Sequence, residues 1–251
     1  MPTDTVDAGL ASCGDQPARR TVASVSLVRH AAQVAWKDLR VELRSRELIY
    51  TVTFFSALVV VVFTFTFPRV EGAVVANVAP GMLWVAIAFA GTIGLGRAFD
   101  REREGDTMRA LLLAPAPRLA VFLGKAVAVM LLMIAVALVV APLLALFLGA
   151  GFFDQPGPLA LSIVLGAIGF SIAGSVFAAA LLRVRARDVL LPVILYPILI
   201  PLFVAATRIA HDLLSAPVDL DDAWYWISFL GMFDAAFLVV SLWVFESLVI
   251  E

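Results

Sequence analysis

Residues 126–153 read AVAVMLLMIAVALVVAPLLALFLGAGFF and contain no charged residue. A helix needs about 20 apolar residues to cross the hydrocarbon core of a bilayer, so this stretch is long enough to span a membrane. Five further stretches have the same character, and only the last of them holds a charge, at Asp234. They are residues 48–67, 72–96, 155–182, 189–207 and 223–245.

The composition of the whole chain points to the same class of protein. Of its 251 residues, 62% are hydrophobic and 15% are charged, whereas about a quarter of a soluble domain is charged. Inside lipid the backbone must satisfy its own hydrogen bonds, which leaves helices or a closed barrel. Barrel strands are short and alternate in polarity, unlike these long uniform runs. We therefore expect an all-α integral membrane protein with six transmembrane helices, at about residues 48–67, 78–97, 124–149, 158–182, 189–208 and 224–246.

The basic residues predict how these spans are oriented, because short loops rich in Lys and Arg stay on the cytoplasmic side. All of them except Arg69 and Arg208 lie before the first span, between the second and third, or between the fourth and fifth. The opposite side holds acidic residues such as Asp154 and the 219–222 loop. Both termini are therefore expected in the cytoplasm. The net charge of -2 leaves no basic excess that would indicate nucleic-acid binding.

Two segments precede the first span. Residues 1–27 have no apolar period and are expected to form a disordered cytoplasmic tail. The apolar stretch after Arg19-Arg20 is short and ends at Arg29, so we expect no cleaved signal. Residues 28–47 predict an amphipathic helix in the membrane interface, at the start of a six-helix domain over 28–251, with a solvated helix as the alternative. Its basic side carries Arg29, Gln33, Lys37, Arg40 and Arg44, and its apolar stripe Ala32, Ala35, Leu39 and Leu43.

Within the bundle, small residues four apart predict places where two helices pack closely. Such pairs occur in the second and fourth spans, and tight packing is the preferred interpretation over a substrate-lining role. Pro142 predicts a kink in the third span, and Pro192, Pro197 and Pro201 predict a broken or re-entrant fifth helix. The small residues are Ala86, Ala90, Gly94, Gly169, Ala173, Gly174 and Ala178.

Few polar residues in the spans are candidates for chemistry. Asp234 lies near the middle of the last span, where a carboxylate costs on the order of 3 kcal/mol and is expected to face the protein interior. It is either a substrate-pathway or coupling residue, or a protonated or hydrogen-bonded packing residue. His30 and His211 fall on opposite sides of the membrane, so each is first an ordinary surface histidine, with His211 a weak candidate heme ligand. The single Cys13 excludes a disulfide framework.

The connection between the second and third spans is the most charged loop of the membrane domain. Its charged segment is expected to break at Gly105, after which Asp106 or Thr107 caps a short amphipathic helix that ends before Pro115. Such a helix suits a subunit that receives force from a soluble motor, and a plain solvated loop is the alternative. The residues expected to carry the coupling are Arg101, Glu102, Arg103, Glu104, Gly105, Asp106, Met108, Arg109, Leu111 and Leu112.

The motor itself is not expected in this chain. The only Gly-Lys pair, Gly124-Lys125, is followed by Ala126 instead of Ser or Thr, and Leu119 stands where a P-loop needs glycine. No nucleophile, base and oxyanion donor resemble a hydrolase site. The chain is therefore expected to be no enzyme, and energy coupling would come from a separate ATPase.

Several motifs together resemble a known family. The run from Glu102 to Lys125 looks like the coupling region of ABC-2 type permeases. Three further stretches, residues 38–47, 80–99 and 185–201, are similar to the heme exporter protein B family, CcmB, the permease of the bacterial and organellar cytochrome c maturation system. The resemblance covers about residues 28–250.

The resemblance implies a function in heme handling for c-type cytochrome biogenesis in the bacterial inner membrane. It implies a CcmA-like ATPase subunit, CcmC- and CcmD-like membrane proteins, a CcmE-like periplasmic heme chaperone, membrane lipid and a second permease copy as partners. It further implies no cofactor in this chain, ATP on the partner subunit, and heme as a cargo whose passage through this subunit is open. ATP hydrolysis would be tied to release of the heme-loaded chaperone.

Two other functions fit the residues. An ABC-2 permease for a polysaccharide, a lipid or a drug would share the charged loop. A membrane scaffold that recruits partners without transport would share the spans.

Overall fold

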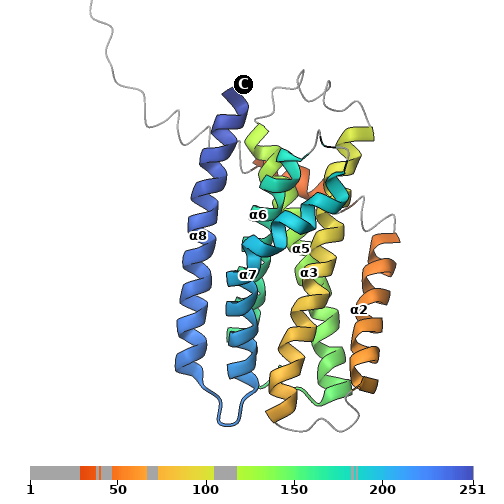
Figure 1. Cartoon of the computed structure of the whole chain (residues 1–251), viewed down its shortest axis with the longest axis vertical. Helices are drawn as coiled ribbons and strands as arrows, with labels where there is room; N and C mark the ends of the chain where they lie inside the picture. The colour runs from red at the N-terminus through yellow and green to blue at the C-terminus, as the bar shows by residue number, and fades with distance from the viewer. Residues whose placement is uncertain are drawn as a thin grey trace, which may run out of the picture.

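The computed structural model describes residues 29–37, 40, 47–66, 73–104, 118–181, 184 and 186–250. In these residues the chain is all helical apart from short connections, and the long helices run side by side as a bundle (Figure 1). The helices are α2 (Glu47–Thr66), α3 (Ala73–Glu104), α5 (Arg118–Leu148), α6 (Pro156–Ala180), α7 (Arg187–Leu214) and α8 (Leu220–Ile250).

Each expected span coincides with one of these helices, but several helices are longer than the sequence predicted. Helix α3 continues for more than one turn past its last apolar residue, Phe99, and ends at Glu104. Five helices of the described chain are long and apolar enough to cross a membrane. In α2 the apolar part, Thr53–Thr66, is shorter.

The chemistry of the helix ends explains where they stop. Helix α5 ends at Leu148 because Gly149 adopts a left-handed conformation, with φ of 66°. Helix α6 begins at Pro156, a position where the missing N–H of proline costs no helical hydrogen bond.

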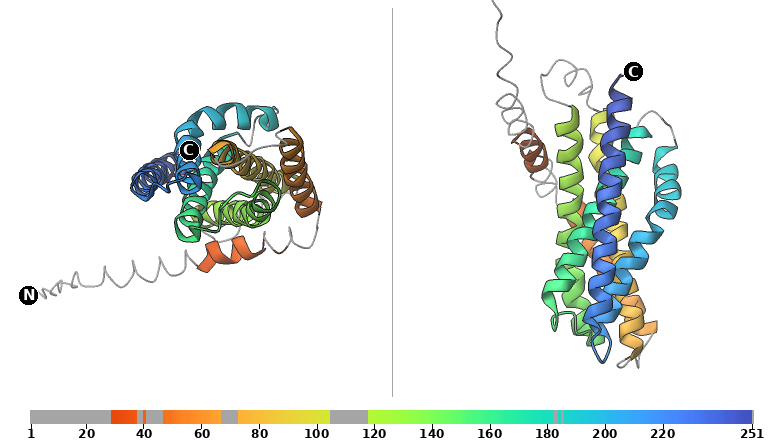
Figure 2. Two further views of the ribbon diagram at one scale, coloured as in Figure 1. Left: turned by 90° about the horizontal axis from the view of Figure 1, so that it is seen from below. Right: turned by 90° about the vertical axis from the view of Figure 1, so that its left-hand side faces the viewer.

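Four helices form the centre of the bundle. Helix α3 packs on α5, α6 and α7, and α6 packs on α5 and α7, while α2 packs mainly on α3 and α5, and α8 mainly on α6 and α7. Figures 1 and 2 show α2 and α8 at opposite edges. Because successive helices alternate in direction, α3 ends where α5 and α7 begin. We name this the basic end, and the end where α7 meets α8 the acidic end.

Small residues allow the central helices to approach closely, as their spacing predicted. A Cβ built at Gly174 of α6 would overlap Leu95 of α3, and one at Gly166 would overlap the indole of Trp84. Ala86 and Ala90 of α3 are fully buried. These contacts fix α3 against α6 without any polar group, as is typical of membrane helices.

Helix α7 corrects the prediction of a broken or re-entrant fifth helix. It is one continuous helix that contains Pro192, Pro197 and Pro201. Figure 1 shows that its first turns lie obliquely across the bundle before the helix turns to follow the other helices. Each proline ring removes one helical hydrogen bond, which bends the helix without ending it.

The N-terminal segment forms a short helix over residues 29–37 that lies beside the bundle (Figure 2). Ala31 and Ala35 are buried, and a Cβ at Gly124 of α5 would lie 2.7 Å from Cβ of Val34. The predicted stripe was wrong at Ala32, which is exposed. The buried face contains Ala31 in place of Ala32, because this side of the short helix packs against α5. Residues 1–28 lie outside the described part.

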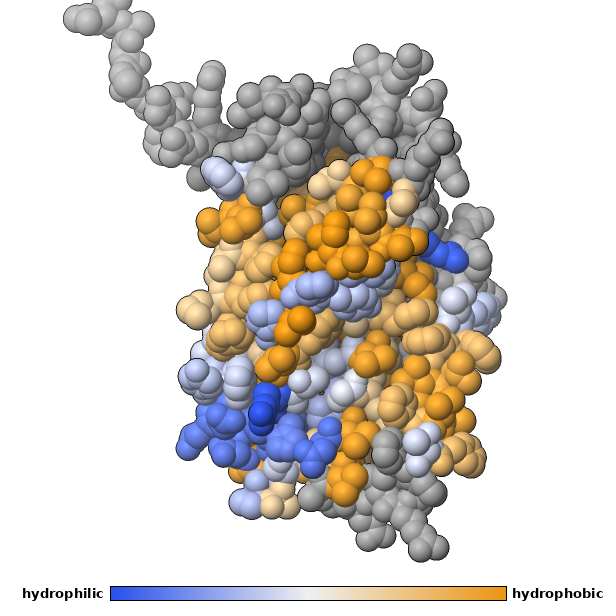
Figure 3. All heavy atoms as spheres, in the orientation of Figure 1, coloured by the Kyte–Doolittle hydropathy of each residue, from blue (hydrophilic) through white to orange (hydrophobic). Residues whose placement is uncertain are grey.

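The outer surface of the bundle is mainly apolar. In Figure 3 apolar residues cover much of the visible face, and hydrophilic residues gather at its lower left, beside the ends of α7 and α8. Exposed residues there include Arg208, Asp219, Asp221 and Asp222. An apolar belt with a polar end is typical of a protein embedded in a bilayer.

Candidate functional site

The predicted coupling connection begins and ends on helices that the structure describes. Arg101, Glu102, Arg103 and Glu104 form the last turn of α3, and α5 begins at Arg118. Gly105, Asp106, Met108, Arg109, Leu111 and Leu112 lie outside the described residues. The end of α3 is therefore the described structure nearest to the predicted coupling residues.

A buried lysine contacts this end of α3. Lys125 of α5 is only 5% exposed, and its ammonium group donates a hydrogen bond to the carbonyl oxygen of Ala98. The same Nζ atom lies 5.1 Å from the centre of the Phe99 ring, over its face. A hydrogen bond and a cation–π contact thus bind one cation to two consecutive residues of α3.

A buried arginine contacts the same helix from α7. Arg187, the first residue of α7, is 2% exposed. Its Nη2 donates to the carbonyl oxygen of Gly96 at 3.0 Å. The bond is charge-assisted, because a guanidinium group donates to a backbone carbonyl oxygen. Arg187 therefore links the start of α7 to α3 about half a turn from the lysine contact.

A third contact lies one turn further down α3. The hydroxyl oxygens of Thr92 and Tyr196 are 3.0 Å apart. Thr92 donates its own proton to the carbonyl oxygen of Ala88, at 2.9 Å. A hydroxyl has one proton to donate, so the Tyr196 hydroxyl is the donor to Thr92.

Together these contacts hold one short part of α3 from two sides. We name the set of Lys125, Arg187 and Tyr196 on residues 92–99 of α3 the α3 clamp. In the sequence, Lys125 and Arg187 served as orientation signals and as parts of the family motifs, and Lys125 was rejected as a P-loop lysine. No buried contact was predicted for either, and Tyr196 was not singled out. A basic residue directly beside an apolar run is the one signal that could have marked them.

Asp234 lies in the interior of the bundle, on α8. It is 6% exposed, and neither carboxylate oxygen has a hydrogen-bond partner in the described part of the chain. A Cβ at Gly169 of α6 would overlap its Oδ1 and lie 2.6 Å from Leu202 of α7. The expected burial is present, but no serine or threonine partner is found. Both interpretations of Asp234, as a pathway or coupling residue and as a protonated or hydrogen-bonded packing residue, stay predictions.

His211 lies at the acidic end, in the last turn of α7. Its Nδ1 is 3.0 Å from Oδ1 of the buried Asp212, and Ser215 donates to its carbonyl oxygen at 2.8 Å. Within the described residues no group of three or more His, Cys, Asp or Glu side chains could hold a metal ion. The role of His211 toward heme stays a prediction.

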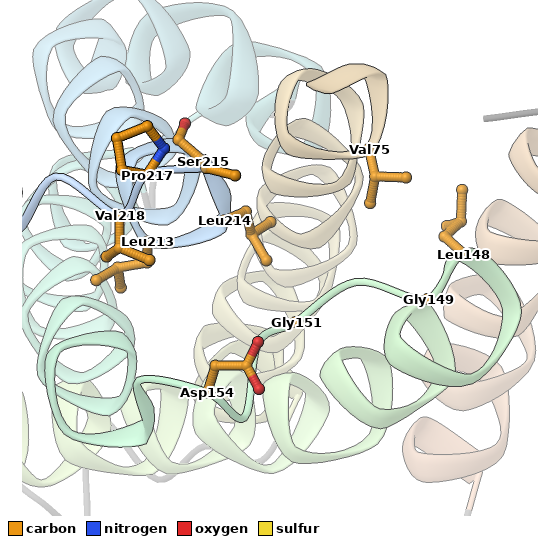
Figure 4. A pocket seen from close by; sticks show the side chains of 11 residues that line it. Val75, Leu148, Gly149, Gly151, Asp154, Leu213, Leu214, Ser215, Pro217 and Val218 are labelled. Carbon is orange, nitrogen blue, oxygen red and sulfur yellow. The ribbon is translucent and has the colours of Figure 1, made fainter. Parts of the chain in front are cut away.

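A pocket opens beside this histidine. Its volume is about 590 Å³, and it lies between the first turn of α3, the end of α5 and the end of α7 (Figure 4). Asp154, from the connection after α5, projects its carboxylate between these ends. The other lining residues are Val75, Leu148, Gly149, Gly151, Leu213, Leu214, Ser215, Ala216, Pro217 and Val218. Three of the four central helices therefore meet at this pocket.

Comparison with known proteins identifies the family. Residues 29–249 match the family model described as CcmB protein. The chain belongs to the CcmB family. As a CcmB protein it is a heme-exporter permease component of the cytochrome c maturation system, a transporter subunit and not a catalytic enzyme. No curated protein matches the chain.

CcmB membership also agrees with the long apolar helices. The matched region begins with the short N-terminal helix and extends through α8. A CcmB permease belongs to an ABC transporter with an ATPase partner, and this chain is a multi-pass membrane protein. The α3 clamp, the buried Asp234 and the pocket at the acidic end are thus features of a transporter subunit.

Proposed function

We propose that this CcmB chain couples ATP hydrolysis on a separate, CcmA-like ATPase to release of a heme-loaded, CcmE-like periplasmic chaperone. The observation that carries the proposal is the family match over residues 29–249. The chain would act as a force-transmitting subunit in heme handling. Heme is a cargo of the whole assembly, and the chain binds no cofactor of its own.

The proposed topology has six spans, with α2 as the first, and both termini in the cytoplasm of a bacterial inner membrane. The distribution of charge supports it. Arg97, Lys125 and Arg187 lie at the basic end, and Asp154 and Asp219 at the acidic end. By the positive-inside rule the basic end faces the cytoplasm.

The ATPase would dock at the connection between α3 and α5. Helix α3 reaches Glu104, beyond its apolar part, so it can project past the headgroups. Lys125, the only candidate for a phosphate-binding lysine in the sequence, is buried and donates to Ala98. That contact supports placing the nucleotide on the partner subunit.

The edge helices supply surfaces for other membrane subunits. Helix α8 exposes Met232, Val239 and Trp243, and α2 exposes Phe54 and Phe65. In the proposed complex CcmC- and CcmD-like proteins, a second permease copy and lipid cover these surfaces. Helices in lipid associate through close packing more than through hydrophobicity, so the shape of these two surfaces would decide which partners bind there.

Purification of the native complex tests this function. We expect the ATPase subunit to co-purify with this chain, and heme absorption to follow the chaperone and not the isolated permease. ATP hydrolysis by the complex, and chaperone release that requires it, would support the proposal. A complex that retains an ATPase but releases no chaperone on ATP addition would refute it, and so would a stable permease with no ATPase.

A further inference from the structure

The short helix over residues 29–37 is held beside the bundle by its inner face (Figure 2). Ala31 and Ala35 are buried on this face, and a Cβ on Gly124 of α5 would lie 2.7 Å from Cβ of Val34. Small residues let the two backbones approach this closely, so the contact fixes the rotation of the short helix about its own axis. The opposite face consequently points away from α5.

That outward face is exposed and basic. Its four positions recur every three or four residues, as one stripe of a helix does. They are Arg29, Gln33, Trp36 and Arg40, and all four are exposed. The sequence over residues 29–46 holds five basic residues and two acidic ones, so the segment carries a net positive charge. An anionic partner is therefore favoured on this face.

Two residues of the outward face form a pair. Trp36 is 59% exposed, and the guanidinium carbon of Arg40 lies over its ring, 5.3 Å from the ring centre. A cation–π contact of this kind holds a guanidinium group by its flat face. The N–H groups lie at the edge of that plane, where arginine binds a phosphate through two parallel hydrogen bonds. The pair thus presents a guanidinium group in a geometry suited to phosphate.

Two observations place the outward face at the surface of the bilayer. Gly124, on which the short helix packs, comes just before the apolar run of α5 that begins at Ala126. On α8 the exposed aromatic residues Tyr225 and Trp243 are separated by about 27 Å of helix, close to the hydrocarbon thickness of about 30 Å. Exposed aromatic residues gather at the two interfaces of a bilayer, so Trp243 marks the interface near the basic end.

We propose that the outward face of this segment binds the phosphate group of anionic phospholipids at the basic end. Arg29 and Arg40 contact the phosphate, and Trp36 holds Arg40 and lies among the head groups. An acidic protein surface would also suit the charge, but the level of the face and the exposed tryptophan, with its apolar ring and polar N–H, favour lipid. The inference does not depend on the coupling role of the chain.

Photochemical cross-linking in the assembled complex tests this binding. The photoreactive residue p-benzoylphenylalanine replaces Ala32, which is exposed beside the outward face and makes none of the proposed contacts. The complex is placed in nanodiscs of phosphatidylcholine and phosphatidylglycerol in equal amounts, with matched acyl chains. After illumination the chain is isolated, and its lipid adducts are quantified by mass spectrometry. We expect phosphatidylglycerol adducts to exceed phosphatidylcholine adducts about tenfold or more at low salt, and the excess to fall as salt rises.

Variants of the outward face assign the contacts. Arg29→Gln and Arg40→Gln should each lower the ratio of the two adducts about fivefold, since one arginine contributes roughly this factor near an anionic surface. Trp36→Leu should lower the ratio as well, because Arg40 loses the ring that holds it. Arg208→Gln, which removes an exposed cation near the acidic end, is the control and should keep the wild-type ratio. Co-purification of the ATPase with each variant verifies assembly.

Several outcomes would overturn the inference. Equal amounts of the two adducts in the wild type, or no lipid adduct at all, would show that the face does not select anionic lipid. A wild-type ratio in both arginine variants would show that these side chains do not bind the phosphate. Cross-linking of position 32 mainly to another subunit would show that a protein covers the face. None of these results bears on the proposed function, which is judged by ATP-dependent release of the chaperone.

Discussion

Gly169 of α6 faces Asp234 of α8 so closely that a Cβ on the glycine would overlap the carboxylate. The contact joins two residues that the sequence suggested for different reasons, one as a small packing residue and one as an isolated charge. It also explains why position 169 has no side chain. The carboxylate fits between α6, α7 and α8 only because that space is left open.

We predict that Gly169→Ala destabilises the protein. The methyl group would meet both Asp234 and Leu202, and overpacking of this kind costs about 1–3 kcal/mol. Thermal unfolding in detergent, followed by tryptophan fluorescence, should show a lower midpoint temperature. The matched control is Gly231→Ala in α8, where a Cβ has no atom within 4 Å. Equal midpoints for the two variants would contradict the close contact.

A second prediction concerns Asp234→Leu. A buried carboxylate with no described partner costs free energy, so an apolar residue of similar size should raise stability by about 1–3 kcal/mol. We expect chaperone release in the assembled complex to fall at the same time, because the pathway or coupling role needs the carboxyl group. Asp234→Asn, which keeps the shape, should show the same functional loss. Normal expression with full release in both variants would remove Asp234 from the mechanism.

The helices themselves could be predicted because lipid imposes one rule on the backbone, and long runs without charge satisfy it. The ends of the helices could not be predicted in this way, since a helix can continue into water, where charged side chains are solvated. Helix α3 shows this: residues 100–104 are all charged, yet they remain helical. The prolines of α7 were recognised, but whether a proline bends or breaks a helix depends on its neighbours, and α3 holds this segment on both sides of Pro192.

The candidate site was harder to predict than the fold. Asp234 was visible as an isolated charge in an apolar run. Lys125 and Arg187 could not be recognised as buried contacts, because in the sequence a buried basic residue and a loop basic residue both occur at the end of a span. Which backbone oxygen each one contacts is decided by how α3, α5 and α7 pack, and no local pattern encodes that.

The coupling connection gives a third prediction. Glu102→Lys with Glu104→Lys reverses charge at the end of α3, and Gly105→Pro stiffens the chain after it. We expect each variant to assemble with the ATPase and to hydrolyse ATP at near the wild-type rate, while chaperone release falls about tenfold or more. ATP turnover and release are measured on the same reconstituted sample. Normal release in these variants would show that this connection is not the coupling element.

The N-terminal helix gives a fourth prediction. Gly124→Leu should displace residues 29–37 from α5, because even a Cβ at this position lies within 2.8 Å of the Ala31 carbonyl oxygen. A loss of about 1–3 kcal/mol corresponds to a roughly 5- to 150-fold faster reaction of Val34→Cys with maleimide in a Cys13→Ser background. Gly81→Leu in α3, where a Cβ meets nothing within 4 Å, is the control and should leave the rate unchanged.

The orientation of the bundle gives the last prediction, and the coupling mechanism depends on it. If the basic end faces the cytoplasm, a cysteine at Gly105 should react with a membrane-impermeant thiol reagent only after the cells are opened. A cysteine at Val218, which is exposed beside the pocket, should react in intact cells once the outer membrane is permeabilised. Each cysteine is placed singly in a Cys13→Ser background, and a permeant reagent measures total reactivity. Labelling of position 105 in intact cells would show that the bundle has the opposite orientation in the membrane. The ATPase could then not reach the α3–α5 connection, since ATP is supplied on the cytoplasmic side.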